Sequence, residues 1–301
     1  MKSAGIIAAG WGERLGQKIP KALTVVGGKT LIDYTLDGLQ AAGITRVTCI
    51  VNEAAQAVPE HVAQSGRKLE MDWIVRTTPS SMHSFLIVLE RLANTPSPQP
   101  SPKKGEGVIK NSLSPTWERA RPTEGQGARH TTGGPASCVA GAAGEGDSSH
   151  FFITTVDSIC PPSAYAEFIR TCDLFPQADV CLGLTTFIDD EKPLRVAMRG
   201  AEGTGIMPET LEDNPEAFEI IAMTNNGFDS EYVTAGFYRA SSKILQETET
   251  VLTKNFTALR QYLGYLLKYG YRFYGVPLPP IVDIDRPQDI QAAEQLLMKK
   301  R

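Results

Sequence analysis

The segment GWGERLGQKIPK, Gly10 to Lys21, follows directly on a short apolar run, Ala4 to Ala9. A glycine-rich turn at the end of a strand exposes backbone N–H groups, and these favour a bound anion. The planar guanidinium of Arg14 can bind two phosphate oxygens at once. Lys21 follows Pro20, whose φ is fixed, and supplies a point charge suited to a reacting phosphorus atom. The segment therefore predicts a loop that holds a polyphosphate.

Two other interpretations of this segment are open. It could be an ordinary turn between a strand and a helix, or a dinucleotide fingerprint, because Gly10, Gly12 and Gly16 form G-x-G-x-x-x-G. A dinucleotide site needs a helix that opens at the second or third glycine and an acidic residue about 20 positions further on. Pro20 would interrupt that helix, and Glu53, the nearest acidic residue after a second strand, lies about twice too far away.

The pattern outward from this loop alternates between strands and helices. Strands are expected at Ala4–Ala9, Arg46–Val51, Met71–Val75, Phe151–Val156, Ala178–Phe187, Tyr232–Tyr238 and Tyr271–Val276, and helices at Lys29–Ala42, from Met82 onward, at Ser163–Cys172, Leu259–Lys268 and Arg286–Lys300. Such alternation predicts right-handed crossovers and ligand binding at the carboxyl ends of the strands. We therefore expect residues 1–301 to form a single α/β domain with a Rossmann-like, mostly parallel mixed sheet flanked by helices.

One internal segment breaks the pattern. Residues 95–149 are rich in Pro, Gly, Ser and Thr, carry few large apolar side chains and show no periodicity. Such a composition cannot bury enough apolar surface to order itself. Because a strand pattern resumes at Phe151, we expect a low-complexity, disordered insertion within the domain.

Composition narrows the classes of function. The formal charge is −4 and Lys and Arg are scattered, which argues against a nucleic-acid partner. No apolar run approaches the roughly 18 residues of a membrane span, so no membrane partner is expected. The five cysteines form no C-x-x-C pair and favour a reduced, cytoplasmic setting. The four histidines lie far apart, without the spacing of a zinc site.

The chain resembles a known family over nearly its whole length apart from the insertion, and the most specific motif runs from Ala8 through the helix after Thr30. The segment AAGWGERLGQKIPKALTVVGGKTLIDYTLDGLQAAGI is similar to the start of the sugar-phosphate nucleotidyltransferases, whose hallmark is G-x-G-x-R followed by P-K. Related cytidylyl- and guanylyltransferases of isoprenoid and molybdenum-cofactor synthesis share this start. Trp11 departs from the small or polar residue usual in the family, and Thr30 stands where proline is frequent.

The resemblance implies how the nucleotide is held. Arg14 would bind the β- and γ-phosphates and Lys21 the α-phosphate, so these two residues are the expected catalytic pair. The loop before the helix at Met82 would read the base or ribose through its hydroxyls, although these could equally cap that helix. The expected nucleotide-binding residues are Ala8, Ala9, Gly10, Gly12, Arg14, Lys21, Ser80 and Ser81.

Two distant aspartates are the expected metal ligands. Asp157 ends the strand FFITTV, where the family places a magnesium-binding aspartate, although it could instead cap the turn at Pro161. The segment IVDIDRPQDI, Ile281 to Ile290, resembles the family signature before the last helix. Asp285, with Pro287 and Gln288 behind it, forms a capping-box pattern and is expected to cap that helix. Asp283 is then left as the second ligand of Mg²⁺, a hard cation that prefers oxygen.

The acceptor side is expected on the segment VTAGFY, which resembles the part of the family that faces the sugar. Thr234 and Gly236 are the expected acceptor-binding residues, with Thr234 in the place of an asparagine. The triad Glu191-Lys192-Pro193 resembles a sugar-phosphate clamp but precedes the segment it should follow. Lys192 is therefore interpreted as an ordinary surface charge.

Taken together, the residues and the resemblance predict a magnesium-dependent nucleotidyltransferase. It would transfer a nucleoside monophosphate from an NTP to a phosphorylated small acceptor and release pyrophosphate. A sugar 1-phosphate is the favoured acceptor. A cytidylyl- or guanylyltransferase with a non-sugar acceptor, such as an alcohol phosphate or molybdopterin, is one alternative. A catalytically silent nucleotide-binding homologue is another, because a fold alone does not name a substrate.

Overall fold

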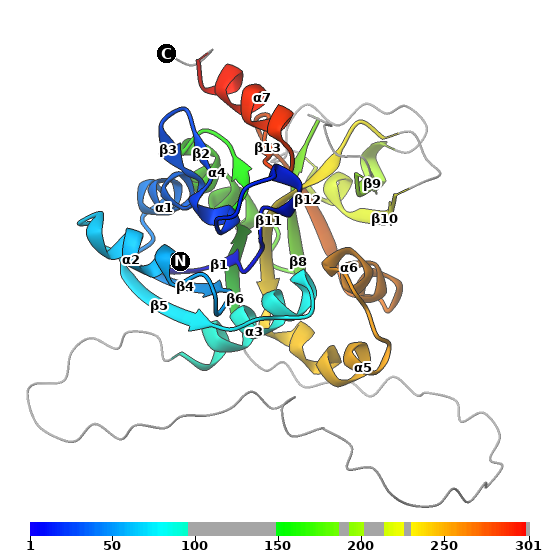
Figure 1. The fold of residues 1–301 in the computed structure, drawn as a ribbon. Coiled ribbons are helices and arrows are strands. Elements are labelled where there is room, and N and C mark those ends of the chain that lie inside the picture. The colour runs from blue at the N-terminus through cyan, green and yellow to red at the C-terminus, as the bar shows by residue number, and fades with distance from the viewer. Residues whose placement is uncertain (96–148, 187–192, 202–213, 226–229, 299–301) are drawn as a thin grey trace, which may run out of the picture.

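The computed structural model describes residues 1–95, 149–186, 193–201, 214–225 and 230–298 (Figure 1). The predicted insertion, apart from its two end residues, and Lys192 lie outside these ranges. The strands are β1 (Ser3–Ala8), β2 (Val25–Val26), β3 (Lys29–Thr30), β4 (Arg46–Val51), β5 (Glu70–Val75), β6 (His150–Thr155), β7 (Ser158–Ile159), β8 (Val180–Thr185), β9 (Arg195–Met198), β10 (Ile220–Thr224), β11 (Val233–Ser241), β12 (Phe273–Pro277) and β13 (Val282–Asp283). The helices are α1 (Leu31–Ala41), α2 (Ala57–Gln64), α3 (Ser81–Asn94), α4 (Ser163–Cys172), α5 (Thr248–Thr253), α6 (Leu259–Lys268) and α7 (Pro287–Met298).

A mixed sheet forms the centre of the molecule. Its first half is parallel in the order β5-β4-β1-β6, and Ile6 of β1 lies opposite Cys49 on one side and Thr154 on the other. Beyond β6 comes the antiparallel strand β11, which also pairs with β8, and β12 runs parallel to β8. The short strands β9 and β10 form the edge next to β11. The predicted α/β class and mixed sheet are confirmed.

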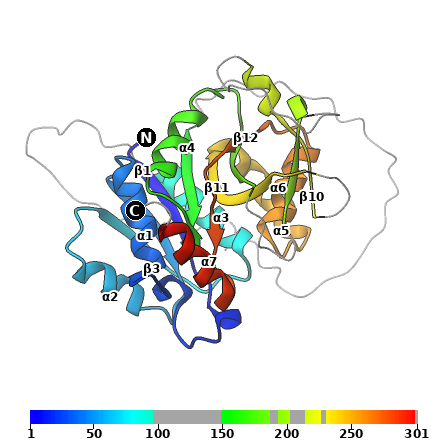
Figure 2. The same ribbon diagram turned by 90° about the horizontal axis from the view of Figure 1, so that it is seen from above.

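The strand order reverses between β1 and β6. From β1 the chain moves through α1 to β4 and then to β5, whereas β6 pairs with the opposite side of β1. Right-handed crossovers in opposite directions place their helices on opposite faces of a sheet. Accordingly, α1 and α4 pack together on one face and α3 and α6 on the other (Figures 1 and 2). In open α/β sheets, this reversal opens a crevice at the carboxyl ends of the strands.

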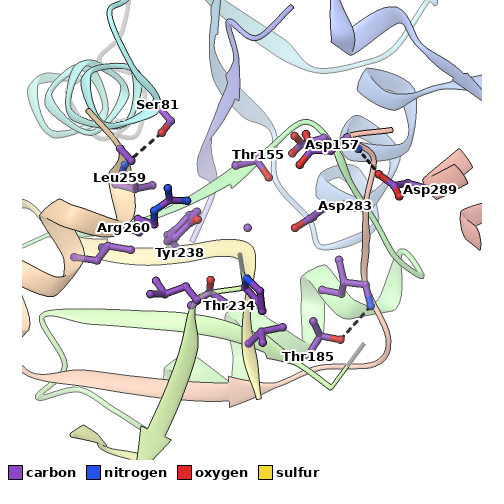
Figure 3. Close-up of a pocket in the computed structure, with 18 of the residues that line it drawn as sticks. Ser81, Thr155, Asp157, Thr185, Thr234, Tyr238, Leu259, Arg260, Asp283 and Asp289 are labelled. Carbon is purple, nitrogen blue, oxygen red and sulfur yellow. Dashed lines mark hydrogen bonds between the residues drawn. The ribbon is translucent and has the colours of Figure 1, made fainter. Parts of the chain in front are cut away.

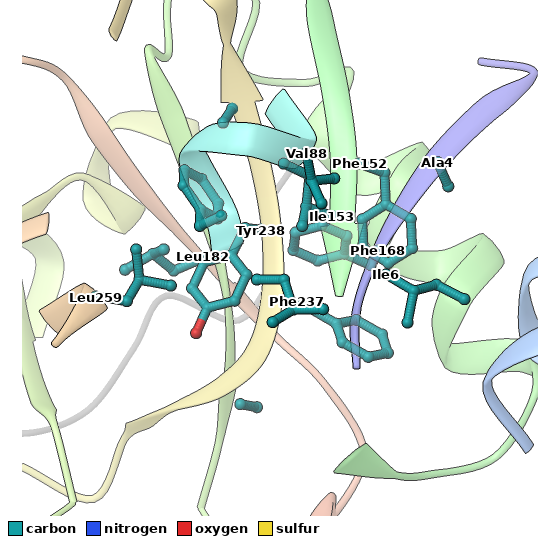
Figure 4. Close-up of a cluster of buried hydrophobic side chains, with 14 of the residues drawn as sticks. Ala4, Ile6, Val88, Phe152, Ile153, Phe168, Leu182, Phe237, Tyr238 and Leu259 are labelled. Carbon is teal, nitrogen blue, oxygen red and sulfur yellow. The ribbon is translucent and has the colours of Figure 1, made fainter. Parts of the chain in front are cut away.

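Both faces of the sheet are apolar, as expected for strands covered on two sides. On the α4 face, Phe152 of β6, Phe168 of α4 and Phe237 of β11 form a cluster with ring centroids 5.3 to 5.6 Å apart (Figure 4). On the other face α3 lies very close to β1, since a Cβ on Gly5 would come within 2.3 Å of Val88. The sheet is therefore a rigid support for the loops at its carboxyl end.

Two further findings concern the state of the cysteines and the character of the helices. The four cysteines among the described residues, Cys49, Cys160, Cys172 and Cys181, are buried and form no disulfide. In the same ranges, none of the helices combines the length and the apolar character that crossing a membrane requires.

Candidate nucleotide and acceptor site

The loop after β1 folds back on itself instead of opening a helix. Only two short 3₁₀ turns form in it, Glu13–Leu15 and Lys21–Leu23. Trp11 forms an isolated bridge with Pro20, and the N–H of Lys21 donates to the carbonyl of Gly10 at 3.3 Å. A dinucleotide fingerprint requires a helix to start within this loop. The structure therefore excludes the dinucleotide interpretation and brings Lys21 back to the end of β1.

The loop forms one wall of a pocket of about 550 Å³. The opposite wall is the segment from Thr78 to Ser84, at the start of α3. Of the predicted nucleotide-binding residues, seven line this pocket: Ala9, Gly10, Gly12, Arg14, Lys21, Ser80 and Ser81. Ala8 does not, because it is the last residue of β1 and is buried. We call this cavity the nucleotide pocket.

The predicted helix caps at the start of α3 have other partners. The hydroxyl of Ser80 lies 2.8 Å from Nδ1 of His83, and no side chain caps the helix by a hydrogen bond. Ser81 Oγ accepts a hydrogen bond of 3.3 Å from the backbone N–H of Leu259, at the start of α6. Capping by these serines is thus wrong, and Ser81 instead ties α3 to α6.

Lys21 lies between two carboxylates at the floor of the site. Its Nζ forms ion pairs with Asp157, two residues after the end of β6, and with Asp285, where the distance is 2.6 Å. Burial alone would lower the pKa of Lys21, but the two carboxylates outweigh it and raise the pKa above its ordinary value. For Asp157, burial alone would raise the pKa of the carboxyl. The positive charge of Lys21 and its hydrogen bond outweigh burial, so the pKa of Asp157 is lowered overall. Both groups of this pair are therefore charged at neutral pH.

Asp283 lies in the wall beside this ion pair. Its Oδ1 accepts a hydrogen bond of 2.6 Å from Ser158, and the pairing of β13 with β7 fixes its position. Asp283 as a residue is exposed and lines a cavity, but protein atoms surround its carboxyl group closely. Burial and then the negative charge of Asp157 raise the pKa of Asp283 to about 7. The predicted metal ligands Asp157 and Asp283 thus lie close enough to repel each other.

The predicted role of Asp285 as a helix cap is wrong. Asp289 Oδ2 accepts the backbone N–H groups of Asp285 at 2.8 Å and of Arg286 at 2.6 Å, so Asp289 caps α7 from within its first turn. Arg286 is the residue just before the helix, and a carboxylate three residues further on can reach back to it. Asp285 precedes that position, so its side chain is free to extend to Lys21.

A second cavity, of about 240 Å³, shares lining residues with the first. Figure 3 shows the residues that line this second cavity. Thr234 and Gly236, the predicted acceptor-binding residues, line it, together with the hydroxyl-bearing residues Thr185 and Tyr238. The pocket also contains the side chain of Arg260, at the start of α6. We call this cavity the acceptor pocket. Ser81, Thr155, Asp157 and Asp285 line both cavities.

Gly236 has a conformational reason to be glycine. It lies at an irregularity in the pairing of β11 with β8 and has a φ of 66°. A Cβ at this position would come within 2.4 Å of Ser158 Oγ and 2.5 Å of Thr155 Oγ1. The bulge therefore brings the backbone of β11 against the hydroxyl that holds Asp283.

Sequence reasoning missed three residues of this site. Asp285 was predicted to cap the helix because its spacing to Pro287 and Gln288 fits a capping box. That spacing alone does not show that Asp289 is the residue that caps the helix. Tyr238 lay within a quoted motif, but a buried strand pattern gives no sign of which side chains face a cavity. Arg260 carried no local signal, because only the packing of α6 against α3 brings it to the pocket.

Comparison with known proteins finds a family model that matches the N-terminal part of the chain. Residues 4–96 match the model of the MobA-like NTP transferase domain. CMP-5'-(3-aminopropyl)phosphonate synthase of Streptomyces rubellomurinus is 31% identical over 85 residues, which are 27% of this chain and 14% of that protein. The present chain thus matches only about a seventh of the length of that curated relative.

Solved structures match over nearly the whole chain. The inositol-1-phosphate CTP transferase from T. maritima has a TM-score of 0.63 at 17% identity and covers 99% of this chain and 96% of its own. A putative glucose-1-phosphate thymidylyltransferase from Bacillus anthracis has a TM-score of 0.63 at 13% identity, covering 98% and 94%. At such identities the likeness establishes the fold. Residues 4–96 are therefore similar to the MobA-like NTP transferase domain, and the chain is similar in fold to the inositol-1-phosphate CTP transferase and to the putative glucose-1-phosphate thymidylyltransferase.

Proposed function

We propose that this protein transfers a nucleoside monophosphate from an NTP to the phosphate of a small acceptor, a sugar 1-phosphate, and releases pyrophosphate. The observation that carries the proposal is the meeting of two pockets at one ion pair. The nucleotide pocket and the acceptor pocket share Asp157 and Asp285 in their walls, and both aspartates bind Lys21. A reaction between two bound molecules requires such a junction.

The nucleotide pocket supplies positive charge along the length of a triphosphate. Arg14 lines it on the glycine loop, and Lys21 lies at its junction with the acceptor pocket. With the reacting α-phosphate at this junction, Arg14 binds the pyrophosphate that leaves, and its two-pronged geometry suits that group. Lys21 stabilises the charge that develops on the transferred phosphoryl group.

The acceptor pocket supplies hydroxyl groups and a cation rather than a general base. Thr234 and Tyr238 can hydrogen-bond to a hydroxylated ring, and Arg260 can balance the charge of a phosphate. A phosphate oxygen is already ionised near neutral pH, so its attack on the α-phosphorus needs no proton transfer. Positioning and charge neutralisation are therefore sufficient for catalysis in this site.

The residues present fit a divalent cation. Asp157 and Asp283 both line the acceptor pocket, and burial followed by the negative charge of Asp157 raises the pKa of Asp283, so a cation between the two carboxylates would relieve their repulsion. No group of three or more His, Cys, Asp or Glu suited to a metal occurs among the described residues. Mg²⁺ is commonly held by one or two carboxylates and completed by substrate phosphates. Asp157 and Asp283 would hold it, and the ion would neutralise phosphate charge.

Two comparisons favour a second candidate within the same chemistry. The curated relative is named for a CMP-linked phosphonate, and a structural neighbour is named for CTP and inositol 1-phosphate. A cytidylyltransferase with a polyol phosphate or a phosphonate as acceptor is therefore the alternative. The two candidates differ in base and acceptor but use the same Lys21 and Asp157.

A pyrophosphate-release assay distinguishes these candidates. The four NTPs are each combined with glucose 1-phosphate, inositol 1-phosphate and 3-aminopropylphosphonate, in the presence of Mg²⁺. We expect release that requires both substrates and that is highest for one NTP, with Asp157→Asn as the inactive control. A wild-type protein that binds NTP but releases no pyrophosphate with any pair would support the silent homologue instead.

A further inference from the structure

The ammonium group of Lys21 lies between two carboxylates, which would also attract a metal ion. Its Nζ contacts Asp157 and lies 2.6 Å from Asp285 Oδ1, and Lys21 itself is 8% exposed. Its backbone is held as well, because its N–H donates to Gly10 and its carbonyl accepts from Thr24. The ammonium group can therefore move only by turning its side chain between nearby partners.

Asp157 therefore has two competing partners, Lys21 and the proposed divalent cation. It is one of the two carboxylates that we assign to the divalent cation, and it is also a partner of Lys21. Two cations on one carboxylate repel each other, because charges a few ångströms apart interact strongly in a partly buried site. Binding of a metal at Asp157 must therefore weaken the contact of Lys21 with that carboxylate.

Asp285 offers Lys21 an alternative anchor. Its side chain is 44% exposed in the cleft and lines both pockets, and it already pairs with Nζ. Its backbone is fixed, because its N–H donates to the buried Asp289. A carboxylate held in this way can retain an ammonium group that leaves Asp157.

We propose that Asp285 is a positioning residue that retains Lys21 when a divalent cation takes Asp157, so that Lys21 and the cation exchange on one carboxylate. This inference rests on the metal site of the proposed function. It assigns to Asp285 a role distinct from that of Asp283: the former holds the lysine and the latter the metal. The ammonium group of Lys21 then remains at the junction of the two pockets.

A double-mutant cycle with Mn²⁺ as the probe tests the proposal without turnover. Binding of Mn²⁺ to the full chain is measured by electron paramagnetic resonance, in the absence of nucleotide, for wild type, Lys21→Met, Asp285→Asn and the double variant. Lys21→Gln is a second form of the lysine change, and thermal unfolding confirms that each variant is folded. Asp173→Asn is the matched control, because its side chain is 73% exposed at the end of α4.

The exchange predicts a specific pattern of affinities. Lys21→Met binds Mn²⁺ more tightly than wild type, because the competing cation is gone. Asp285→Asn binds it more weakly, because Lys21 is then confined to Asp157. This weakening shrinks by about tenfold in the Lys21→Met background, in the range of coupling found between contacting residues. Asp173→Asn matches wild type.

Other outcomes overturn the proposal. If Asp285→Asn weakens Mn²⁺ binding equally with and without Lys21, Asp285 acts only as a nearby negative charge. Weaker binding in both Lys21 variants, or no binding to them, shows that the lysine does not compete for Asp157. The pyrophosphate-release assay judges the proposed function separately, since strong coupling in a protein that transfers no nucleotide would retain the exchange and reject the reaction.

Discussion

Replacement of Asp289 by alanine should destabilise the protein more than replacement of Asp285. Asp289 is 3% exposed, and its Oδ2 accepts two backbone N–H groups at 2.8 and 2.6 Å. Loss of a helix cap costs about 1 kcal/mol. The second, partly buried donor that loses its acceptor adds about 1 kcal/mol. Asp289→Ala should therefore lower the free energy of unfolding by about 2 kcal/mol, which corresponds to a fall in Tm of about 4 to 8 °C.

The matched variants separate the cap from the ion pair. Asp289→Asn keeps one carbonyl acceptor and should lose less than half as much stability as the alanine variant. Asp285→Ala should lose less than 1 kcal/mol, because Lys21 keeps Asp157 as its partner. Urea unfolding followed by circular dichroism measures all three. A larger loss in Asp285→Ala than in Asp289→Ala would refute the cap assignment and restore the capping box predicted from the sequence.

Three other changes test separate parts of the structure. Gly236→Ala should destabilise the protein by at least about 1 kcal/mol, from its positive φ alone, and should lower acceptor affinity more than NTP affinity; unchanged denaturant unfolding would contradict the bulge. Arg14→Ala should weaken binding of an NTP more than of the monophosphate in calorimetry, with only partial rescue by Arg14→Lys, and an equal loss for both nucleotides would place Arg14 away from the pyrophosphate. Burial alone would raise the pKa values of Asp33 and Asp37, but hydrogen bonds and cationic partners lower both values overall. The ion pairs of these carboxylates with Arg67 therefore stabilise the folded protein at neutral pH, and this stabilisation is lost as the pH falls below about 4. Arg67→Met should thus destabilise the protein at pH 7 but much less at pH 3 in thermal unfolding.

Local patterns sufficed for most of the fold. The strand Arg46–Val51 and the helices Ser163–Cys172 and Leu259–Lys268 have the bounds expected from their periodicity. The insertion of β11 antiparallel between β6 and β8 was not foreseen, because a strand's direction depends on its neighbours and not on its own sequence. The strands β9 and β10 were also missed, since both are short and lie at the edge.

In the candidate site too, some residues were expected from the sequence and others could be assigned only from the structure. The loop from Gly10 to Lys21 and Asp157 were each expected at the carboxyl end of a strand, and the structure brings Lys21 into contact with Asp157. The roles of Asp285 and Asp289 could not be separated by spacing, because each lies within one turn of the start of α7. Their assignment required the hydrogen bonds to Asp289 and the ion pair to Lys21.

Transfer of label from the α-phosphate tests the central claim most directly. The protein is incubated with Mg²⁺, each NTP labelled with ³²P at the α-phosphorus and the acceptor that gave the greatest pyrophosphate release, and the products are separated by chromatography. The account predicts that label moves into a product containing both nucleotide and acceptor, in equal amount to pyrophosphate, and that Lys21→Met and Asp157→Asn lose this transfer. Label recovered only in the free nucleoside monophosphate, or transfer that survives both substitutions, would contradict it.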